Sequence, residues 1–266
     1  SHKGQYGKVL IVGGDAGMGG AAILTSESAL MSGAGLITLL TKKDNVSASL
    51  LRTPEVMTYD ISNFINFSSY FEGIDTVVCG VGLGDSEWSK EAFIKTIECC
   101  KDKQINLILD AGALRLLSKI NIENARLPKN LILTPHPGEL ARLFPEWAGL
   151  DRVEVASNFA KDYDRTTLLL KGAHTLIARS GSPVYFNGTG NAGMASGGQG
   201  DVLTGIISSL LAQGLEPQDA ARMGAWLAGR AAELAVSHGD ESVQSLVASD
   251  VCKCLGRAFI DMGSQP

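Results

Sequence analysis

Short apolar runs alternate with helical patterns along most of this chain, and this alternation limits the folds that it can adopt. The runs are bounded by glycine or polar residues, as buried strands are: Lys8–Val12, Leu36–Thr41, Thr76–Cys79, Leu107–Asp110, Leu131–Leu133 and Thr167–Leu170. Helical patterns lie between them at Ala21–Met31, Lys90–Cys100 and Asp151–Tyr163. Such alternation is typical of a parallel sheet whose connecting helices cover it. We therefore predict an α/β fold with a central, mainly parallel sheet flanked by helices on both faces.

The remaining predicted elements fit the same architecture. A strand is predicted at Pro54–Tyr59, and a hairpin pairs Leu176–Ala178 with Val184–Phe186. Two long helices follow at Pro217–Ser237 and Ala248–Ile260. The chain has 266 residues, of which 45% are hydrophobic, and no repeat or linker-like stretch divides it. We predict one domain over residues 1–266.

Charge and composition argue against several kinds of partner. The net charge is −5 and no basic cluster occurs, which disfavours nucleic acid and anionic membranes. No apolar run approaches the roughly 20 residues of a membrane span, and no signal-peptide pattern opens the chain. The five cysteines fit neither a disulfide framework nor a zinc site. We expect a cytoplasmic protein with reduced, mostly buried thiols.

A glycine-rich stretch at 188–200 leads into a strongly apolar predicted helix. The apolar residues of that helix recur at helical spacing from Val202 to Leu211, and Gly214 is placed to end it. Glycines at this point let backbone N–H groups approach an anion closely, and the helix N-terminus adds partial positive charge. The stretch therefore predicts a phosphate-binding loop.

Asp201 follows this loop at once and has two interpretations. A carboxylate is a poor neighbour for phosphate, so Asp201 could be the base that takes a proton from the group attacking the phosphate. Alternatively it is only the N-cap of the helix, a position that Asp favours. The stretch by itself does not separate the two.

Several other strand ends carry polar residues or glycine, as the ligand-binding edge of an open α/β sheet does. Asp110 ends one strand and is either functional or a cap of the next helix. Lys171 lies between a buried strand and a glycine; it is either a surface charge or a contact to phosphate. His136 lies between two prolines that hold it extended, and Pro137 and Glu139 are suited to open a helix.

The glycine-rich turn at 13–20, GGDAGMGG, matches neither of the common nucleotide-binding patterns. It lacks the G-x-G-x-x-G of a dinucleotide-binding fold and the GK[ST] ending of a P-loop. Close packing of the first strand on the first helix is one explanation for these glycines, and ligand contact is the other.

The sequence GNAGMASGGQGDVLTGI resembles the signature of the ADP/ATP-dependent NAD(P)H-hydrate dehydratases, whose fold is ribokinase-like. Four further stretches match that family in the same order: HKGQYGKVLIVGG, GVGLG, TPHPGE and KGAHT. The resemblance spans nearly the whole chain. It implies a carbon–oxygen lyase that repairs hydrated NADH or NADPH, uses ADP or ATP as co-substrate, and needs Mg²⁺ bound to the nucleotide.

The resemblance also implies roles for particular residues. Asp201 would be the catalytic base, and Ala21, Gly84, His136 and Asp201 would contact the NAD(P)H hydrate. The nucleotide would contact Lys171, Gly172, Ala173, His174, Thr175, Asn191, Gly193, Met194, Gly197, Gly198, Gln199 and Gly200. No residue is assigned as a metal ligand. The family pattern DADAL reads DAGAL here, so Gly112 replaces a carboxylate and puts an acidic pair at this strand end in doubt.

The same resemblance sets expectations for partners. The family is often fused to a hydrate epimerase, so we expect this chain, which begins with Ser1, to be one half of a bifunctional protein. A homo-oligomer, tetrameric or higher, is expected. Two rival functions share the glycine run and Asp201: a small-molecule kinase of the same fold, and a nucleotide-binding protein without catalysis. The sequence does not choose between ADP and ATP, although bacterial relatives use ADP.

Overall fold

The computed structural model describes residues 6–101, 103–119, 127–128, 130–239 and 241–263. Within these residues nine strands form one sheet in the order β3-β2-β1-β4-β5-β6-β7-β8-β9. The strands are β1 Lys8–Val12, β2 Leu36–Thr41, β3 Met57–Asp60, β4 Thr76–Cys79, β5 Asn106–Leu109, β6 Asn130–Leu133, β7 Thr166–Leu170, β8 Leu176–Ala178 and β9 Tyr185–Phe186. All neighbours from β3 to β7 are parallel, and β7-β8 and β8-β9 are antiparallel. The predicted sheet and its hairpin are confirmed.

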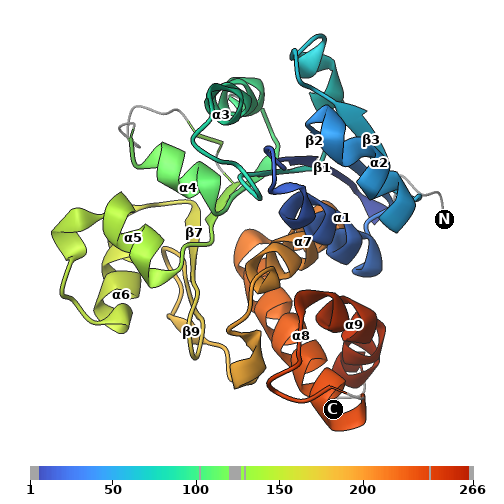
Figure 1. Cartoon of the computed structure of the whole chain (residues 1–266). Coiled ribbons are helices and arrows are strands. Elements are labelled where there is room, and N and C mark those ends of the chain that lie inside the picture. Colours follow the sequence, from blue (N-terminus) through green and yellow to red (C-terminus); the bar gives the residue numbers. More distant parts are fainter. Residues whose placement is uncertain (1–5, 102, 120–126, 129, 240, 264–266) are drawn as a thin grey trace.

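Helices cover both faces of this sheet (Figure 1). The longer ones are α1 Gly19–Met31, α2 Lys43–Arg52, α3 Glu87–Cys100, α6 Arg152–Asp162, α7 Gln199–Ala212, α8 Pro217–His238 and α9 Ala248–Gly263. The shorter ones are α4 Gly112–Leu117, α5 Pro137–Leu143 and the 3₁₀ turns η2 Phe67–Phe71, η4 Pro145–Trp147 and η5 Ala192–Met194.

Alternate residues of each strand feed two separate cores, because successive side chains of a strand point to opposite faces. Val9 and Ile11 of β1 join the core beneath α1, α7, α8 and α9. Leu10 and Val12 join the core beneath α3, α4, α5 and α6. Both faces of the central strands are buried, which explains why those strands read as continuous apolar runs.

Some predicted boundaries were wrong. The third strand begins at Met57, because Thr53 and Val56 form a turn through a 3.1 Å backbone hydrogen bond. Helix α3 begins at Glu87, where Ser86 caps it by accepting from the N–H of Ser89. Helix α2 was not predicted; only one of its residues is buried, so its apolar periodicity is weak. Gly214 follows α7 with a φ of 96°, as expected of a residue that ends a helix.

The five cysteines are free thiols, and Cys79, Cys100 and Cys252 are buried. No helix in the described part of the chain is both long and apolar enough to cross a membrane.

Candidate active site

The loops that follow the parallel strands are joined to one another at the carboxyl edge of the sheet. After β1, the N–H of Asp15 donates to the carbonyl of Gly82 in the loop after β4, at 2.7 Å. The N–H of Gly112, after β5, donates to the carbonyl of Gly80 at 3.2 Å. After β7, the N–H of Lys171 donates to the carbonyl of Pro135, in the loop after β6, at 2.9 Å. These backbone bonds join the loops after β1, β4 and β5 to one another, and the loop after β6 to the loop after β7; together the loops form a rim along this edge.

Helix α7 begins beside this rim with a left-handed residue. Its N-cap is Gly198, with φ of 88°, and Asp201 lies in the first turn. The alternative interpretation of Asp201 as the N-cap is therefore wrong. The N–H groups of Gln199, Gly200 and Asp201 belong to the first turn, which has no acceptors within the helix. A side chain at Gly198 would be strained by the backbone, and its Cβ would lie 2.8 Å from Leu24 Cδ1.

Asp110 lies between the ends of β7 and α7, with its side chain 1% exposed. Its Oδ1 accepts from the ammonium of Lys171 at 2.6 Å, and its Oδ2 accepts from the hydroxyl of Thr204 at 2.7 Å. The interpretation of Asp110 as a helix cap is wrong, because the N-cap of α4 is Ala111. Lys171 is paired rather than a plain surface charge. A Cβ at Gly200 would lie 3.1 Å from Lys171 Nζ, so this ammonium lies against the first turn of α7.

The environment of Asp201 raises the pKa of its carboxyl to about 7. Burial is the main cause, since it disfavours the charged form. The nearby negative charge of Asp110 raises the pKa further, and the ammonium of Lys171 opposes both effects. A carboxyl that titrates near neutral pH is suited to accept a proton, because general bases work best with a pKa near the operating pH.

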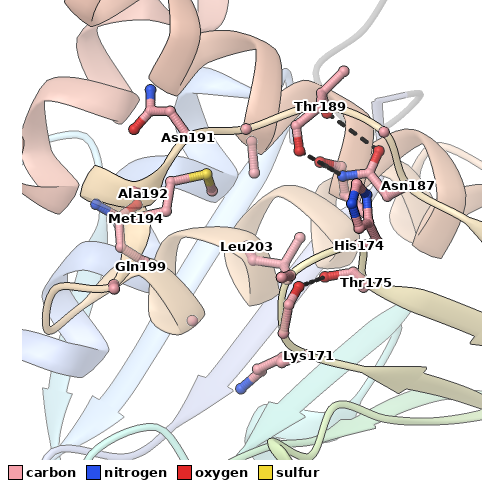
Figure 2. A pocket seen from close by; sticks show the side chains of 18 of the residues that line it. Lys171, His174, Thr175, Asn187, Thr189, Asn191, Ala192, Met194, Gln199 and Leu203 are labelled. Atoms are coloured by element: carbon pink, nitrogen blue, oxygen red, sulfur yellow. Dashed lines mark hydrogen bonds between the residues drawn. The ribbon is translucent and has the colours of Figure 1, made fainter. Parts of the chain in front are cut away.

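A cavity of about 640 Å³ opens beside the first turn of α7 (Figure 2). Its walls come from the β7–β8 loop, the glycine-rich stretch and α8. Nine of the twelve predicted nucleotide contacts line it: Lys171, Gly172, Ala173, His174, Thr175, Asn191, Met194, Gln199 and Gly200. Gly193, Gly197 and Gly198 do not line it, although all three belong to the same glycine-rich stretch. The volume is within the range of small-molecule sites.

Part of the cavity wall was not predicted. Asn187 and Thr189 line it and bond to α8: Asn187 Nδ2 donates to the carbonyl of Ala225 at 3.2 Å, and Thr189 Oγ1 to that of Trp226 at 3.0 Å. Leu203, Ala225 and Ala228 add an apolar surface. Thr189 lies in the glycine-rich stretch and Asn187 directly precedes it, so their position in the sequence could have identified both residues. The α8 residues carry no such signal.

None of the four predicted substrate contacts, Ala21, Gly84, His136 and Asp201, lines this cavity, although Asp201 directly follows Gln199 and Gly200, which do. Ala21 directly follows the glycine pair Gly19–Gly20 and is the third residue of α1. A Cβ at Gly84 would lie 2.8 Å from Met18 Cε and 3.0 Å from a carboxylate oxygen of Asp15. Ala21 and Gly84 are therefore associated with the loops after β1 and β4, whereas the cavity is bounded by the loop after β7.

His136 has a structural role that sequence reasoning missed. It is the N-cap of α5, and its Nδ1 accepts from the N–H groups of Gly138 and Glu139 at 3.0 and 3.3 Å. Glu139 closes the capping box by accepting from the N–H of His136 at 2.9 Å. The predicted start of this helix at Pro137 is confirmed. The side chain of His136 remains about half exposed, at 54%.

Asp15 is a second buried carboxylate that the sequence analysis did not single out. Its oxygens accept from Ser86 and from Ser89, the latter at 2.7 Å, and one lies 3.1 Å from the ammonium of Lys42. Burial by itself would raise the pKa of Asp15, but these bonds together with the Ala16 N–H lower it to about 2. Asp15 is therefore ionised near neutral pH, and its bonds join the loops after β1, β2 and β4.

The missing carboxylate at Gly112 has a steric explanation. A Cβ built there would lie 2.2 Å from the backbone oxygen of Leu83, so this backbone leaves no room for a side chain. An acidic pair nevertheless exists at the end of β5, because Asp110 and Asp201 interact electrostatically. The second carboxylate comes from α7 rather than from position 112.

No group of three or more His, Cys, Asp and Glu side chains in the described residues is arranged to hold a metal ion. Asp110 and Asp201 are two carboxylates, and Asp110 is already paired with Lys171 and Thr204. The donor set therefore suits a cation whose other ligands are phosphate oxygens and water.

Comparisons with known proteins assign the chain to a known family. The NAD(P)H-hydrate dehydratase family model matches residues 9–253. The bifunctional NAD(P)H-hydrate repair enzyme Nnr of Escherichia coli is 40% identical over 97% of this chain and 48% of its own length. The ADP-dependent (S)-NAD(P)H-hydrate dehydratase of Neisseria meningitidis is 38% identical over 88% of this chain and 79% of its own. The chain thus spans about half the length of the bifunctional relatives.

Solved structures agree with this result. The ADP/ATP-dependent NAD(P)H-hydrate dehydratase of Bacillus subtilis, co-crystallised with ATP and Mg²⁺, has a TM-score of 0.81 at 30% identity and covers 98% of this chain and 91% of its own. Ribokinase of Thermotoga maritima, at 14% identity and a TM-score of 0.59 over 94% of this chain and 99% of its own, shares the fold alone. The predicted ribokinase-like fold and the predicted resemblance are both confirmed: this chain belongs to the NAD(P)H-hydrate dehydratase family.

Proposed function

We propose that this chain dehydrates the S-epimer of NADH hydrate or NADPH hydrate and consumes ADP or ATP in doing so. The observation that carries the proposal is the position of Asp201: a carboxyl with a pKa raised to about 7, in the first turn of α7. Lys171 lies against the same turn, and the cavity opens beside it. A base, a cation and free backbone N–H groups are what phosphoryl transfer requires.

The nucleotide would occupy the cavity of about 640 Å³ with its phosphates toward α7. The positive end of the helix, the backbone N–H groups of the first turn and the Lys171 ammonium favour anionic groups there. Leu203, Ala225 and Ala228 offer an apolar surface for a base. The predicted contacts of Gly193, Gly197 and Gly198 remain predictions; their part would be to shape the loop.

The hydrate would lie on the other side of Asp201, toward the loops after β1, β4 and β6. Ala21, Gly84 and His136 belong to those elements, and Thr25 of α1 donates to the carbonyl of Asp201 at 3.1 Å. Asp201 would then stand between the two substrates. This is the placement that the predicted contacts of all four residues with the hydrate require.

The reaction would proceed in two steps. In the first step the Asp201 carboxylate takes the proton of the ring hydroxyl, and the hydroxyl oxygen forms a bond to the terminal phosphorus of the nucleotide. The bond between that phosphorus and the rest of the nucleotide breaks at the same time. The ring carbon–oxygen bond of the phosphorylated hydrate then breaks. Phosphate leaves, a proton is lost from the neighbouring carbon, and the ring double bond is restored. The N–H groups of Gln199 and Gly200 would stabilise the charge on the transferring phosphate.

Mg²⁺ would be held mainly by the nucleotide phosphates and water, and it would neutralise charge on the phosphates. Relatives named ADP-dependent from Neisseria meningitidis and Streptococcus thermophilus favour ADP as the co-substrate. The rival function of a small-molecule kinase is less well supported, because the structures of hydroxyethylthiazole kinase and ribokinase match at 18% and 14% identity and share only the fold.

The reaction is tested by incubating the protein with hydrated NADH and ADP, with ATP as a second arm. Recovery of the dihydronicotinamide absorbance at about 340 nm is expected. Omission of the nucleotide is the control. Release of AMP without recovery of absorbance would favour the kinase, and nucleotide binding with no turnover would favour a non-catalytic protein.

We further propose that the chain is one domain of a bifunctional, cytoplasmic protein. The name of the Escherichia coli relative and the half-length match support a fused epimerase domain. Homo-oligomerisation is supported by exposed apolar side chains such as Leu51 and Ile65. Light scattering of the purified chain tests the oligomer, and the length of the native open reading frame tests the fusion.

A further inference from the structure

Arg152 binds the loop between β7 and β8 through backbone carbonyls. Its Nη1 donates to the carbonyl of Ala173 at 2.7 Å. Its Nη2 lies within hydrogen-bond distance of three more carbonyls, those of Leu170, Lys171 and His174, at 3.1, 3.3 and 3.4 Å. Residues 171–175 of this loop line the cavity, whereas Arg152 does not. Arg152 therefore holds the loop from behind.

The position of Arg152 is itself fixed by the start of α6. Asp151 is the N-cap of that helix and accepts from the N–H groups of Val153 and Glu154 at 2.8 and 2.9 Å. Glu154 completes the capping box. The side chain of Arg152 thus leaves from a rigid turn. Its five donors in one plane suit several carbonyls at once, which a lysine ammonium does not match.

Because Arg152 binds these carbonyls, the direction of the loop N–H groups is also fixed. In a trans peptide the C=O and the following N–H point in opposite directions. The carbonyls of Lys171 and Ala173 face Arg152, so the N–H groups of Gly172 and His174 face away from it. No acceptor in the described part of the chain pairs with either N–H group.

The loop has adopted unusual backbone angles to reach this arrangement. His174 has φ of 53°, a left-handed conformation that is uncommon outside glycine. Gly172 has φ of 143°, and a Cβ there would lie 3.0 Å from the guanidinium carbon of Arg152. The absence of a side chain at 172 is what lets the guanidinium approach.

The charge of Arg152 is also not neutralised locally. Among the described residues no carboxylate forms an ion pair with it, and its Nη donors are directed at neutral carbonyls. A cation beneath the loop makes the potential at the N–H groups more positive, which favours electron-rich atoms of a ligand.

We propose that Arg152 is a positioning residue for the nucleotide: by holding the carbonyls of the β7–β8 loop, it directs the N–H groups of Gly172 and His174 into the cavity, where they donate to acceptor atoms of ADP or ATP. The inference rests on the proposed function, because it requires the nucleotide to occupy this cavity. The acceptors are phosphate oxygens or nitrogens and oxygens of the adenosine.

The test compares the variants Arg152→Gln and Arg152→Lys with the parent protein. The matched control is Arg257→Gln, which replaces an exposed arginine on α9. Calorimetric affinities for ADP, inorganic pyrophosphate and adenosine are measured without hydrate, together with the melting temperature and both KM values. We expect the affinity for ADP to fall about tenfold or more in both Arg152 variants. The loop N–H groups would then lose a hydrogen bond to the nucleotide, and one hydrogen bond to a charged group changes an affinity by roughly tenfold or more. The hydrate KM and the control variant should not change.

The arms of the experiment identify the acceptor. Loss of pyrophosphate binding assigns the loop to the phosphates, and loss of adenosine binding assigns it to the nucleoside; either supports the proposal. Unchanged ADP affinity, or equal losses for ADP and hydrate, would overturn it. If Arg152→Gln fails to fold, Arg152→Lys supplies the same test, because it keeps the positive charge but loses the planar set of donors. A parent protein that binds no ADP would overturn the proposed function, and this inference with it.

Discussion

The ammonium of Lys171 lies 2.6 Å from Oδ1 of Asp110, so the end of β7 is paired with the end of β5 across β6. Thr204 of α7 binds the other oxygen of Asp110 at 2.7 Å. Three segments far apart in the sequence thereby converge on the turn that carries Asp201. Asp110 raises the pKa of Asp201 and Lys171 lowers it, so the charges of the three side chains are coupled.

Asp201→Asn should abolish most turnover while leaving the fold intact. Removing a general base typically lowers the rate by about 10²–10⁴. Asn is nearly isosteric, and Asp201 is not the cap of α7, so packing should change little. The rate of NADH recovery and the affinity for ADP are the measurements. Turnover comparable with the parent would refute the role of Asp201.

The same variant should change how stability depends on pH. Folding raises the pKa of Asp201 from 3.8 to about 7, so between these values the folded state binds more protons than the unfolded state. The contribution of Asp201 to the free energy of unfolding is therefore fully present below the pKa of the unfolded state, and it is lost as the pH rises through about 7. Asp201→Asn should therefore gain stability relative to the parent as pH rises through this window. Parallel curves of melting temperature against pH would contradict the raised pKa.

Asp110→Asn should move the acid limb of the pH profile of kcat/KM to lower pH. Burial is the larger cause of the raised pKa of Asp201, and the charge of Asp110 is the second; only the second is removed. The measurement is kcat/KM for the hydrate from acid to neutral pH. Asp219→Asn, a surface carboxylate on α8, is the control and should leave the limb in place. An unshifted limb in Asp110→Asn would show that the two carboxylates are not coupled.

Lys171→Met should raise the nucleotide KM, with little change in the hydrate KM, and should move the acid limb to higher pH. The shift follows because the ammonium of Lys171 lowers the pKa of Asp201. The variant also leaves the buried Asp110 without its cation, so a loss of about 1–3 kcal/mol in the free energy of unfolding is expected. Lys253→Met removes an exposed lysine and serves as the control. Equal changes in both KM values would argue against a nucleotide contact.

His136→Asn separates the cap of α5 from contact with the hydrate. Asn is a strong N-cap, so the melting temperature should stay close to that of the parent, whereas His136→Ala should lose about 1 kcal/mol. If His136 also contacts the hydrate, both variants should raise the hydrate KM and leave the nucleotide KM alone. A normal hydrate KM in His136→Asn would leave the capping box as the role of this residue.

Much of the fold was predictable from local patterns. The parallel strands other than the edge strand β3 are largely buried on both faces, so each of them reads as an apolar run regardless of its neighbours. The glycine run before α7 was also readable, because close approach of a backbone to an anion requires glycine locally. Where local patterning was weak, as in the mostly exposed α2, prediction failed.

By itself the sequence determined the parallel sheet, the glycine-rich start of α7 and the family, because these depend on residues adjacent in the chain. The tertiary structure decided the charge and geometry of the site. The pairing of Asp110 with Lys171, the raised pKa of Asp201 and the binding of four backbone carbonyls by Arg152 each depend on contacts between distant segments. Burial and the distance between charges set those properties, and both exist only once the strands have brought their carboxyl ends together.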